Sequence, residues 1–195
     1  NGGTIRPTQV ELISGTCSGF ASLTTAGVGR TIQTFSGTIT GQTSITIYAA
    51  AATALNLSPL SPTVQAGASQ TFTATATDLY GNPATIAPQW YAQSGEVLPG
   101  PSATSIYTAQ TTPAPHNDII TATQAGLTAS TGVSIVAGPL AVLTITPTSI
   151  TVTVSCTNSL TATGTDQYGN PVILAPNWSS DVGQVVGNVT GLISS

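Results

Sequence analysis

A stretch of 36 residues occurs twice in this chain, and no other feature limits its fold so strongly. Residues 55–90 recur without a gap as residues 143–178, with the same amino acid at 17 of the 36 positions. The same shift of 88 residues places 31–49 over 119–137. We therefore predict one whole unit over 52–138. The flanking segments 1–51 and 139–195 correspond to the second and the first half of such a unit.

The composition resembles that of prokaryotic surface coats and pili, in which neighbouring subunits or glycans cover the chain. Charged residues make up 4% of the 195 residues, and the only cations are Arg6 and Arg30. A soluble intracellular protein carries about 25% charged residues. A net charge of -4 argues against nucleic acid as a partner, because two arginines cannot form a basic patch. The same charge argues against binding to an anionic membrane.

The remaining signals point outside the cell. No apolar run is long enough to span a membrane. A chain that starts at Asn1 without a leader fits a secreted protein whose signal peptide has been removed, and it also fits a chain that has been trimmed. Acceptor sequons for glycans begin at Asn56, Asn177 and Asn188. Glycans are therefore expected partners, and glycosylation of this kind fits an archaeal source.

Short alternating runs rich in β-branched residues predict strands at 44–48, 71–77, 143–146 and 150–154. Each run ends at or near Gly, Pro or Asn, and no stretch shows an amphipathic helical stripe with caps. Strands of this length and spacing are typical of an all-β sandwich. We expect almost no helix.

Each copy of the repeat contains the sequence Tyr-Gly-Asn-Pro, at 80–83 and 168–171, preceded by Asp78 or Asp166. Gly and Asn tolerate positive φ, and the aspartate can accept backbone N–H bonds within the turn. The alternative is a calcium site with Asp78 and Asn82 as ligands, but one carboxylate per turn falls far short of the six to eight oxygens that calcium takes. No metal site is predicted.

Trp90 and Trp178 follow Ala-Pro at the same place in the two copies. A tryptophan on the third strand of a sandwich commonly packs at the centre of the core. The alternative is a tryptophan that stacks on a carbohydrate ligand, but Gln89 and Asn177 are the only amides close by. Both tryptophans are predicted to be core residues.

The order of these signals resembles a known family. An opening strand, then Thr-Ala-Thr-x-Thr-Asp-x-Tyr-Gly-Asn-Pro, then Ala-Pro-x-Trp is similar to the immunoglobulin-like domains of the invasin and intimin type, which are strung in tandem on bacterial and archaeal surface proteins. The resemblance implies tandem immunoglobulin-like β-sandwiches, one complete and two half-domains. It implies no catalytic residue and no cofactor.

The residues themselves also argue against an enzyme. The one histidine, His116, lies in a Pro-rich segment that is expected to be a surface loop, and no nucleophile motif accompanies it. The six carboxylates are scattered singly, so no acid and base pair is evident.

The two cysteines occur only in the incomplete halves. Cys17 lies in the first half-unit and Cys156 in the last, whereas the whole unit has Ser105 and Ala68 at the equivalent positions. This distribution predicts a disulfide between complementary halves, and the alternative is two buried free thiols.

A half-sandwich cannot bury its apolar face alone, so each half needs a complement. Short connectors disfavour folding back within one chain. Pairing residues 139–195 of one molecule with residues 1–51 of the next propagates head to tail, because this contact does not close on itself. The stretch 4–14 is a candidate donated strand, and Pro7 favours an edge position for it.

The sequence thus predicts a homopolymeric, extracellular cell-surface filament subunit that resembles archaeal donor-strand pili and threads, with an intersubunit Cys17–Cys156 disulfide. Two alternatives stay open. One is a stalk segment of a longer adhesin. The other is a carbohydrate-binding module, which would need an exposed row of aromatics such as Tyr80, Tyr91, Tyr107 and Tyr168.

Overall fold

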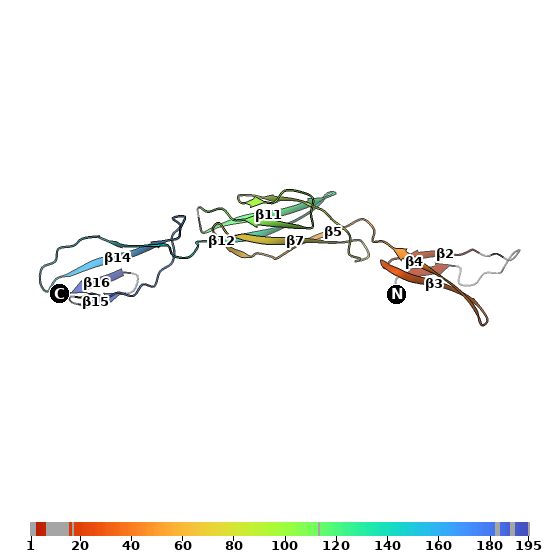
Figure 1. The fold of residues 1–195 in the computed structure, drawn as a ribbon, viewed down its shortest axis with the longest axis horizontal. Helices are drawn as coiled ribbons and strands as arrows, with labels where there is room; N and C mark the ends of the chain where they lie inside the picture. The colour runs from red at the N-terminus through yellow and green to blue at the C-terminus, as the bar shows by residue number, and fades with distance from the viewer. Residues whose placement is uncertain are drawn as a thin grey trace.

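The computed structural model describes residues 3–6, 16, 18–112, 114–181, 184–187 and 190–194. In these residues every regular element is a β-strand, so the predicted all-β class is confirmed. They include no apolar helix of membrane-spanning length. Three groups of strands follow one another along the longest axis of the molecule (Figure 1).

The middle group, strands β5 to β12, forms a sandwich of two four-stranded sheets, which we call the middle sandwich. The strands of the first sheet, in spatial order, are β5 (Ala54–Ser58), β7 (Ser69–Thr77), β10 (Thr104–Thr108) and β9 (Glu96–Val97). Those of the second sheet are β6 (Thr63–Gln65), β12 (Leu127–Val136), β11 (His116–Gln124) and β8 (Gln89–Ala92). All neighbouring pairs are antiparallel except β6 with β12, which is parallel.

The core of the middle sandwich comes from the alternating residues of both sheets. Phe72, Tyr107, Ile120 and Ile135 are almost completely buried, and the rings of Phe72 and Tyr107 meet edge to face with their centroids 6.3 Å apart. Alternation works here because successive side chains of a strand point to opposite faces, so every second residue enters the space between the sheets.

The N-terminal group consists of two small sheets. β1 (Gly3–Arg6) pairs with β2 (Phe20–Leu23), and β3 (Gly27–Ser36) pairs with β4 (Ile39–Ile47) in what we call the N-terminal hairpin. This hairpin reproduces β11 and β12 of the middle sandwich at a distance of 88 residues. The register agrees over Arg30–Ser36, and a bulge between Gly27 and Arg30 shifts the remaining pair by one residue. Arg30 faces Ile45 in the hairpin as Asp118 faces Val133 in the sandwich.

The C-terminal group is one four-stranded sheet, the C-terminal sheet, with the spatial order β13 (Val142–Thr146), β14 (Thr157–Thr165), β16 (Thr190–Ser194) and β15 (Gln184–Gly187). The order matches that of β5, β7, β10 and β9 in the first sheet of the middle sandwich. Leu140 and Leu174 lie over Gly164 on this sheet, where an added Cβ would meet both side chains.

One predicted strand is wrong. No strand forms within 150–154, although its counterpart in the middle sandwich contains β6. The reason is that β6 is held by β12 of the second sheet, and the described C-terminal residues contain no counterpart of β12. The predicted domain boundaries, at 51/52 and 138/139, stay predictions.

Candidate functional site: the junctions between strand groups

The Asp-x-Tyr-Gly-Asn turn is the most strongly hydrogen-bonded local feature of the repeat. Asp78 Oδ1 accepts the backbone N–H groups of Tyr80 and Asn82, both at 2.9 Å. Gly81 has a φ of 80° and Gly169, its equivalent, a φ of 85°, a conformation that favours glycine. The carboxylate therefore organises the turn, as the sequence predicts.

The same turn also contacts the N-terminal group, which the sequence did not predict. Asn82 Oδ1 accepts a hydrogen bond from Ala26 N at 2.8 Å, and Asn82 Nδ2 donates to the carbonyl of Thr24 at 2.8 Å. Asp78 Oδ2 accepts from Ala50 N, in the connector, at 2.9 Å. The turn thus joins the middle sandwich to both the connector and a loop of the preceding group.

The second copy of the turn makes the equivalent contacts at the other junction. Asn170 Oδ1 accepts from Ala114 N at 2.9 Å, and Asn170 Nδ2 donates to Thr111 O at 2.6 Å. Asp166 Oδ2 accepts from Gly138 N at 2.8 Å. We call each set an aspartate–asparagine clamp. The contacts recur because both turns and both contacted segments are related by about the same 88-residue shift.

The clamps depend on ionised carboxylates. The side-chain hydrogen bond from Asn82 is the main cause that lowers the pKa of Asp78 to about 2. Burial by itself raises the pKa of Asp166, but hydrogen bonds from Asn170, Gly138 and Tyr168 outweigh it and leave the pKa at about 2. Hydrogen bonds to the charged form favour that form, so both clamps are charged at neutral pH.

A ring contact reinforces the second junction. Gly67 of the middle sandwich has a φ of 74°, and a Cβ added to it would lie 2.5 Å from the hydroxyl oxygen of Tyr168. The ring of Tyr168 therefore lies directly against the Gly67 backbone. Tyr80, the equivalent at the first junction, is 59% exposed, so the second junction is the more closely packed.

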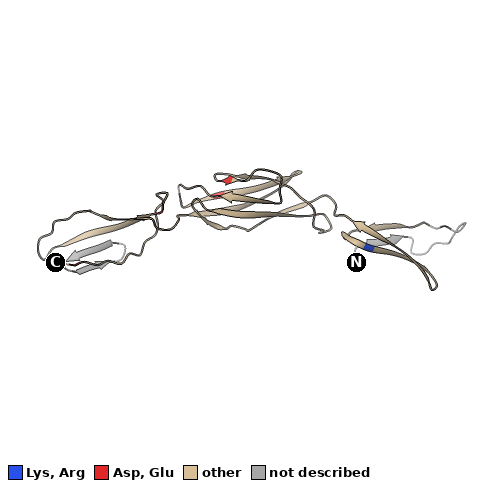
Figure 2. Ribbon diagram, in the orientation of Figure 1, with Lys and Arg blue, Asp and Glu red and all other residues tan. Residues whose placement is uncertain are grey.

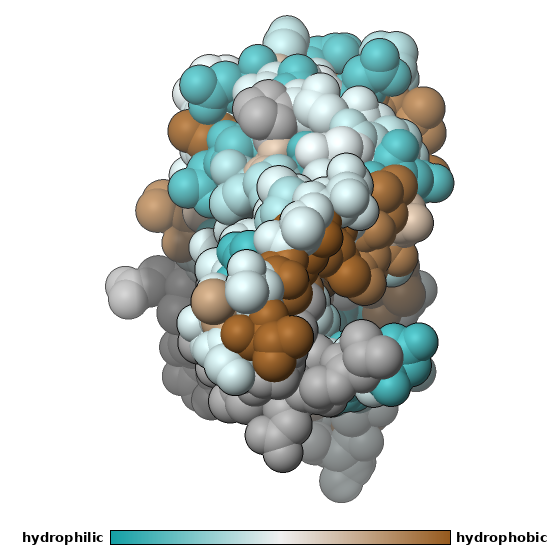
Figure 3. Space-filling view, turned by 90° about the vertical axis from the view of Figure 1, so that its left-hand side faces the viewer, coloured by the Kyte–Doolittle hydropathy of each residue, from teal (hydrophilic) through white to brown (hydrophobic). Residues whose placement is uncertain are grey.

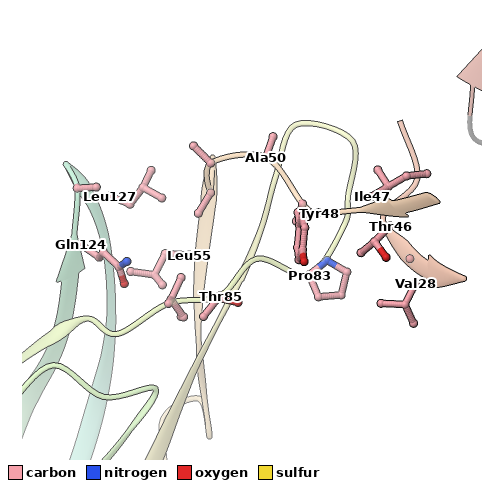
Figure 4. Close-up of a pocket in the computed structure, with 16 residues that line it drawn as sticks. Val28, Thr46, Ile47, Tyr48, Ala50, Leu55, Pro83, Thr85, Gln124 and Leu127 are labelled. Carbon is pink, nitrogen blue, oxygen red and sulfur yellow. The ribbon is translucent and has the colours of Figure 1, made fainter. Parts of the chain in front are cut away.

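A hollow of about 670 Å³ lies at the first junction, between the end of the N-terminal hairpin and the middle sandwich (Figure 4). Leu55, Gln124 and Leu127 of the middle sandwich lie at one end of it and Val28, Thr46 and Ile47 of the hairpin at the other, with Tyr48 and Pro83 between them (Figure 4). Its lining is mostly apolar, and Tyr48 is its one titratable residue. This arrangement offers no acid, base or nucleophile pair.

The described residues form no other chemical centre. Charged side chains are sparse along the ribbon (Figure 2), and the described part of the chain has no group of three or more His, Cys, Asp or Glu that could hold a metal. Asp78 uses its oxygens for the turn and the connector.

His116 differs from the prediction of a surface loop. It begins β11 and is half-buried, and neither ring nitrogen has a hydrogen-bond partner among the described residues. The Pro-rich composition before it concealed the strand start. The segment leads directly into the central hairpin of the second sheet, which removes the ring from bulk solvent.

Tyr107 cannot belong to an exposed aromatic row. It is completely buried, and its hydroxyl donates to Asp118 Oδ2 at 2.8 Å. Burial and the neighbouring carboxylate raise the pKa of Tyr107. Burial opposes the charge of Asp118, but hydrogen bonds from Gly95, Tyr107, Ile119 and Ser94 lower its pKa.

The two tryptophans have different environments. Trp90 is buried in the core, and its Nε1 donates to Ser102 O at 2.8 Å. Trp178 is only half-buried, because β11, which pairs with the Trp90 strand, has no counterpart in the described C-terminal residues. Trp178 is thus a core residue only if another segment covers it.

The predicted disulfide and glycan sites are placed in part. Cys156 is exposed and carries a free thiol. Cys17 and Asn188 lie outside the described residues. Asn56, on the edge strand β5, and Asn177 are exposed. The disulfide and the glycans stay predictions, as does most of the donated strand, since 7–14 also lies outside the described residues and Gly3–Arg6 pairs with β2.

Comparison with known proteins shows the fold. No family model matches the sequence, and no curated protein matches it. Among solved structures, FdeC, an adhesin of Escherichia coli, is 22% identical over 77% of this chain and 58% of that one, with a TM-score of 0.51. Invasin, a bacterial integrin-binding protein, is 18% identical over 91% of this chain and 42% of that one, with a TM-score of 0.52. The chain is thus a tandem, immunoglobulin-like β-sandwich protein, and it spans less than two thirds of either structure's length.

Proposed function

We propose that this protein is a structural subunit of an extracellular filament on a prokaryotic cell surface, with no catalytic activity of its own. Subunits join head to tail when the N-terminal group of one molecule completes the C-terminal sheet of another. The fold shared with FdeC and invasin supports a surface role, since FdeC is named an adhesin and invasin an integrin-binding protein.

The observation that carries the proposal is the exposure of core positions outside the middle sandwich. Leu57 is 7% exposed, whereas the equivalent Ile145 is 45% exposed. Ala66 is 6% exposed, whereas the equivalent Val154 is 81% exposed. Apolar side chains gather on the C-terminal end of the molecule (Figure 3). A contiguous apolar surface of this kind marks an interaction site.

The clamps support a mechanical role. Each junction is fixed by several hydrogen bonds between the repeated turn and the preceding strand group. Bonds that span a connector oppose rotation of one strand group against the next. A chain of such units is a stiff rod, which suits reach and attachment.

Assembly of this kind is open-ended. The surface on the C-terminal sheet differs from the surface on the N-terminal hairpin, so the contact is heterologous and repeats without closing. A bond between Cys17 and the exposed Cys156 would make successive subunits covalent, and glycans on exposed asparagines would cover the uncharged surface. Archaeal cells are the source that best fits this combination.

Negative-stain microscopy and light scattering of the purified chain test the proposal. We expect uniform fibres from the unmodified chain and from Ile119→Asp, which changes a residue on the exposed face of β11. Ile47→Asp should give monomers, because Ile47 is equivalent to the core residue Ile135. Discrete short rods from the unmodified chain at all concentrations would refute the filament.

A stalk segment of a longer adhesin is the second candidate, favoured by the fold of FdeC and invasin. In that case neighbouring repeats of the same polypeptide complete both flanking groups, and the chain alone gives short rods. A carbohydrate-binding module is disfavoured, because the buried Tyr107 breaks the aromatic row.

A further inference from the structure

The middle sandwich contains a template for the contact between two copies. Its second sheet has the order β6, β12, β11, β8, so the β11–β12 hairpin lies at the centre and is flanked by two short strands. The N-terminal hairpin repeats this centre in sequence position and, over Arg30–Ser36, in register. Residues 151–153 and 177–180 occupy the positions of β6 and β8 in the repeat.

From this template we infer that the N-terminal hairpin of a second copy enters between residues 151–153 and 177–180 and completes the sandwich over the C-terminal sheet. The inference rests on the proposed head-to-tail assembly and adds which segment is inserted and in which register. The inserted segment is a two-stranded hairpin and not the single strand predicted at 4–14.

The template fixes the residue pairs. In the middle sandwich Ile135 faces Val64 in the parallel ladder, and Thr121 faces Tyr91 in the antiparallel one. The shift of 88 residues turns these pairs into Ile47 with Val152 and Gln33 with Ser179. The ladders of the second sheet continue from these pairs in both directions.

The apolar faces are complementary under this register. Ile32, Ile45 and Ile47 of the hairpin are half-buried, whereas their equivalents in the middle sandwich, Ile120, Val133 and Ile135, are at most 1% exposed. On the other side of the joint Ile145, Val152 and Val154 are exposed. Closing the sandwich therefore removes both sets from water, and this burial favours the joined state.

The repeat itself favours a second copy as the occupant. The N-terminal hairpin carries the pairing of the central hairpin of the second sheet, with Arg30 facing Ile45 as Asp118 faces Val133.

Two single-cysteine variants of the full chain test the register. Both carry C17S and C156S, so that native thiols cannot contribute. One adds Gln33→Cys and the other Ser179→Cys, positions equivalent to Thr121 and Tyr91, whose side chains lie on the outer face of the sheet because Tyr91 is exposed. Mixed, denatured together, refolded and oxidised, they should give a reductant-sensitive mixed dimer that neither variant gives alone.

Thr31→Cys paired with Ser179→Cys is the matched control. Residue 31 is two positions from residue 33 on the same face, and a disulfide does not form when Cα atoms are more than about 7 Å apart. Equal cross-linking in the control, or fibres without the Gln33–Ser179 bond, would overturn the inserted hairpin and leave the filament intact. Absence of any oligomer, seen by light scattering, would overturn both.

Discussion

The middle sandwich and its flanking groups are built from one repeated sequence, yet they differ in how much core they close. Phe72, Ile120 and Ile135 of the sandwich are nearly inaccessible to water. In the C-terminal group Ile145 and Val154, at positions equivalent to the buried Leu57 and Ala66, are 45% and 81% exposed. The order of β13, β14, β16 and β15 nevertheless matches that of β5, β7, β10 and β9.

The difference separates local from long-range causes. Pairing of β3 with β4, or of β13 with β14, needs only an alternating sequence and a suitable turn. A buried core needs two sheets face to face. The C-terminal group is one sheet of such a pair, and the N-terminal hairpin repeats the centre of the other. They show how far the sequence of the repeat folds before its complement is present.

The largest expected effect compares one substitution at two equivalent positions. Ile120→Ala should lower the free energy of unfolding of the middle sandwich by about 2–5 kcal/mol, because it opens a cavity in a closed core. Ile32→Ala should cost about 1 kcal/mol or less in a single chain, because Ile32 is only half-buried. Hydrogen exchange followed strand by strand during denaturant titration measures both.

The assembled state reverses this expectation for Ile32. In fibres Ile32→Ala should approach the cost of Ile120→Ala, because the same position then lies in a closed core. If Ile32→Ala lowers the free energy of unfolding by the same small amount in single chains and in fibres, the hairpin is not buried on assembly.

The repeat accounts for most of what could be predicted from the sequence. Alternation at 71–77 and 143–146 gives β7 and β13, and the Tyr-Gly-Asn-Pro segments give turns stabilised by Asp78 and Asp166. These features are local, because each depends on neighbouring residues alone.

The clamps and the missing strand at 150–154 could not be predicted in this way. Asn82 contacts Thr24 and Ala26, which are 58 and 56 residues away. Asparagine is common in turns, so its presence at position 82 gave no reason to expect a contact outside the turn. A usable signal was present, since each motif follows a predicted unit boundary at nearly the same distance. The strand at 150–154 failed because its ladder partner belongs to the second sheet.

The next effect concerns a charge that differs between the copies. Asp118→Asn should destabilise the middle sandwich by about 1.5–3 kcal/mol, because the carboxylate accepts four hydrogen bonds in a buried site. Arg30→Gln, at the equivalent position of the hairpin, should change the stability of a single chain by about 0.5 kcal/mol at most. Thermal denaturation monitored by tryptophan fluorescence compares the two, and similar losses would contradict the contrast.

A smaller effect distinguishes the two junctions. Asn170→Ala should cost about 1–3 kcal/mol, because Asn170 is buried and its loss leaves Ala114 N without its partner. Asn82→Ala should cost about 1 kcal/mol, because Asn82 is half-buried. Exchange rates of the Ala26 and Ala114 amides report each clamp, with the exposed Asn117→Ala as control. Unchanged amide exchange in both variants would show that the clamps do not hold the junctions.

Acid should have the smallest effect over most of the accessible pH range. The pKa of both Asp78 and Asp166 is about 2 in the folded chain, whereas the ordinary pKa of an aspartate is 3.8. A carboxyl group with a lowered pKa stabilises the folded chain fully at pH values above the pKa that it has in the unfolded chain. This stabilisation is lost as the pH falls through the pKa that it has in the folded chain. The junction amides of Ala50 and Gly138 should therefore stay protected from hydrogen exchange between pH 7 and about pH 4 and lose protection progressively below pH 4.

Asp78→Asn should remove this pH dependence at Ala50 and leave it at Gly138, because each carboxylate accepts a hydrogen bond from the amide of its own connector. Loss of protection at both amides near pH 5 would mean that the carboxylates are not the groups that hold the connectors.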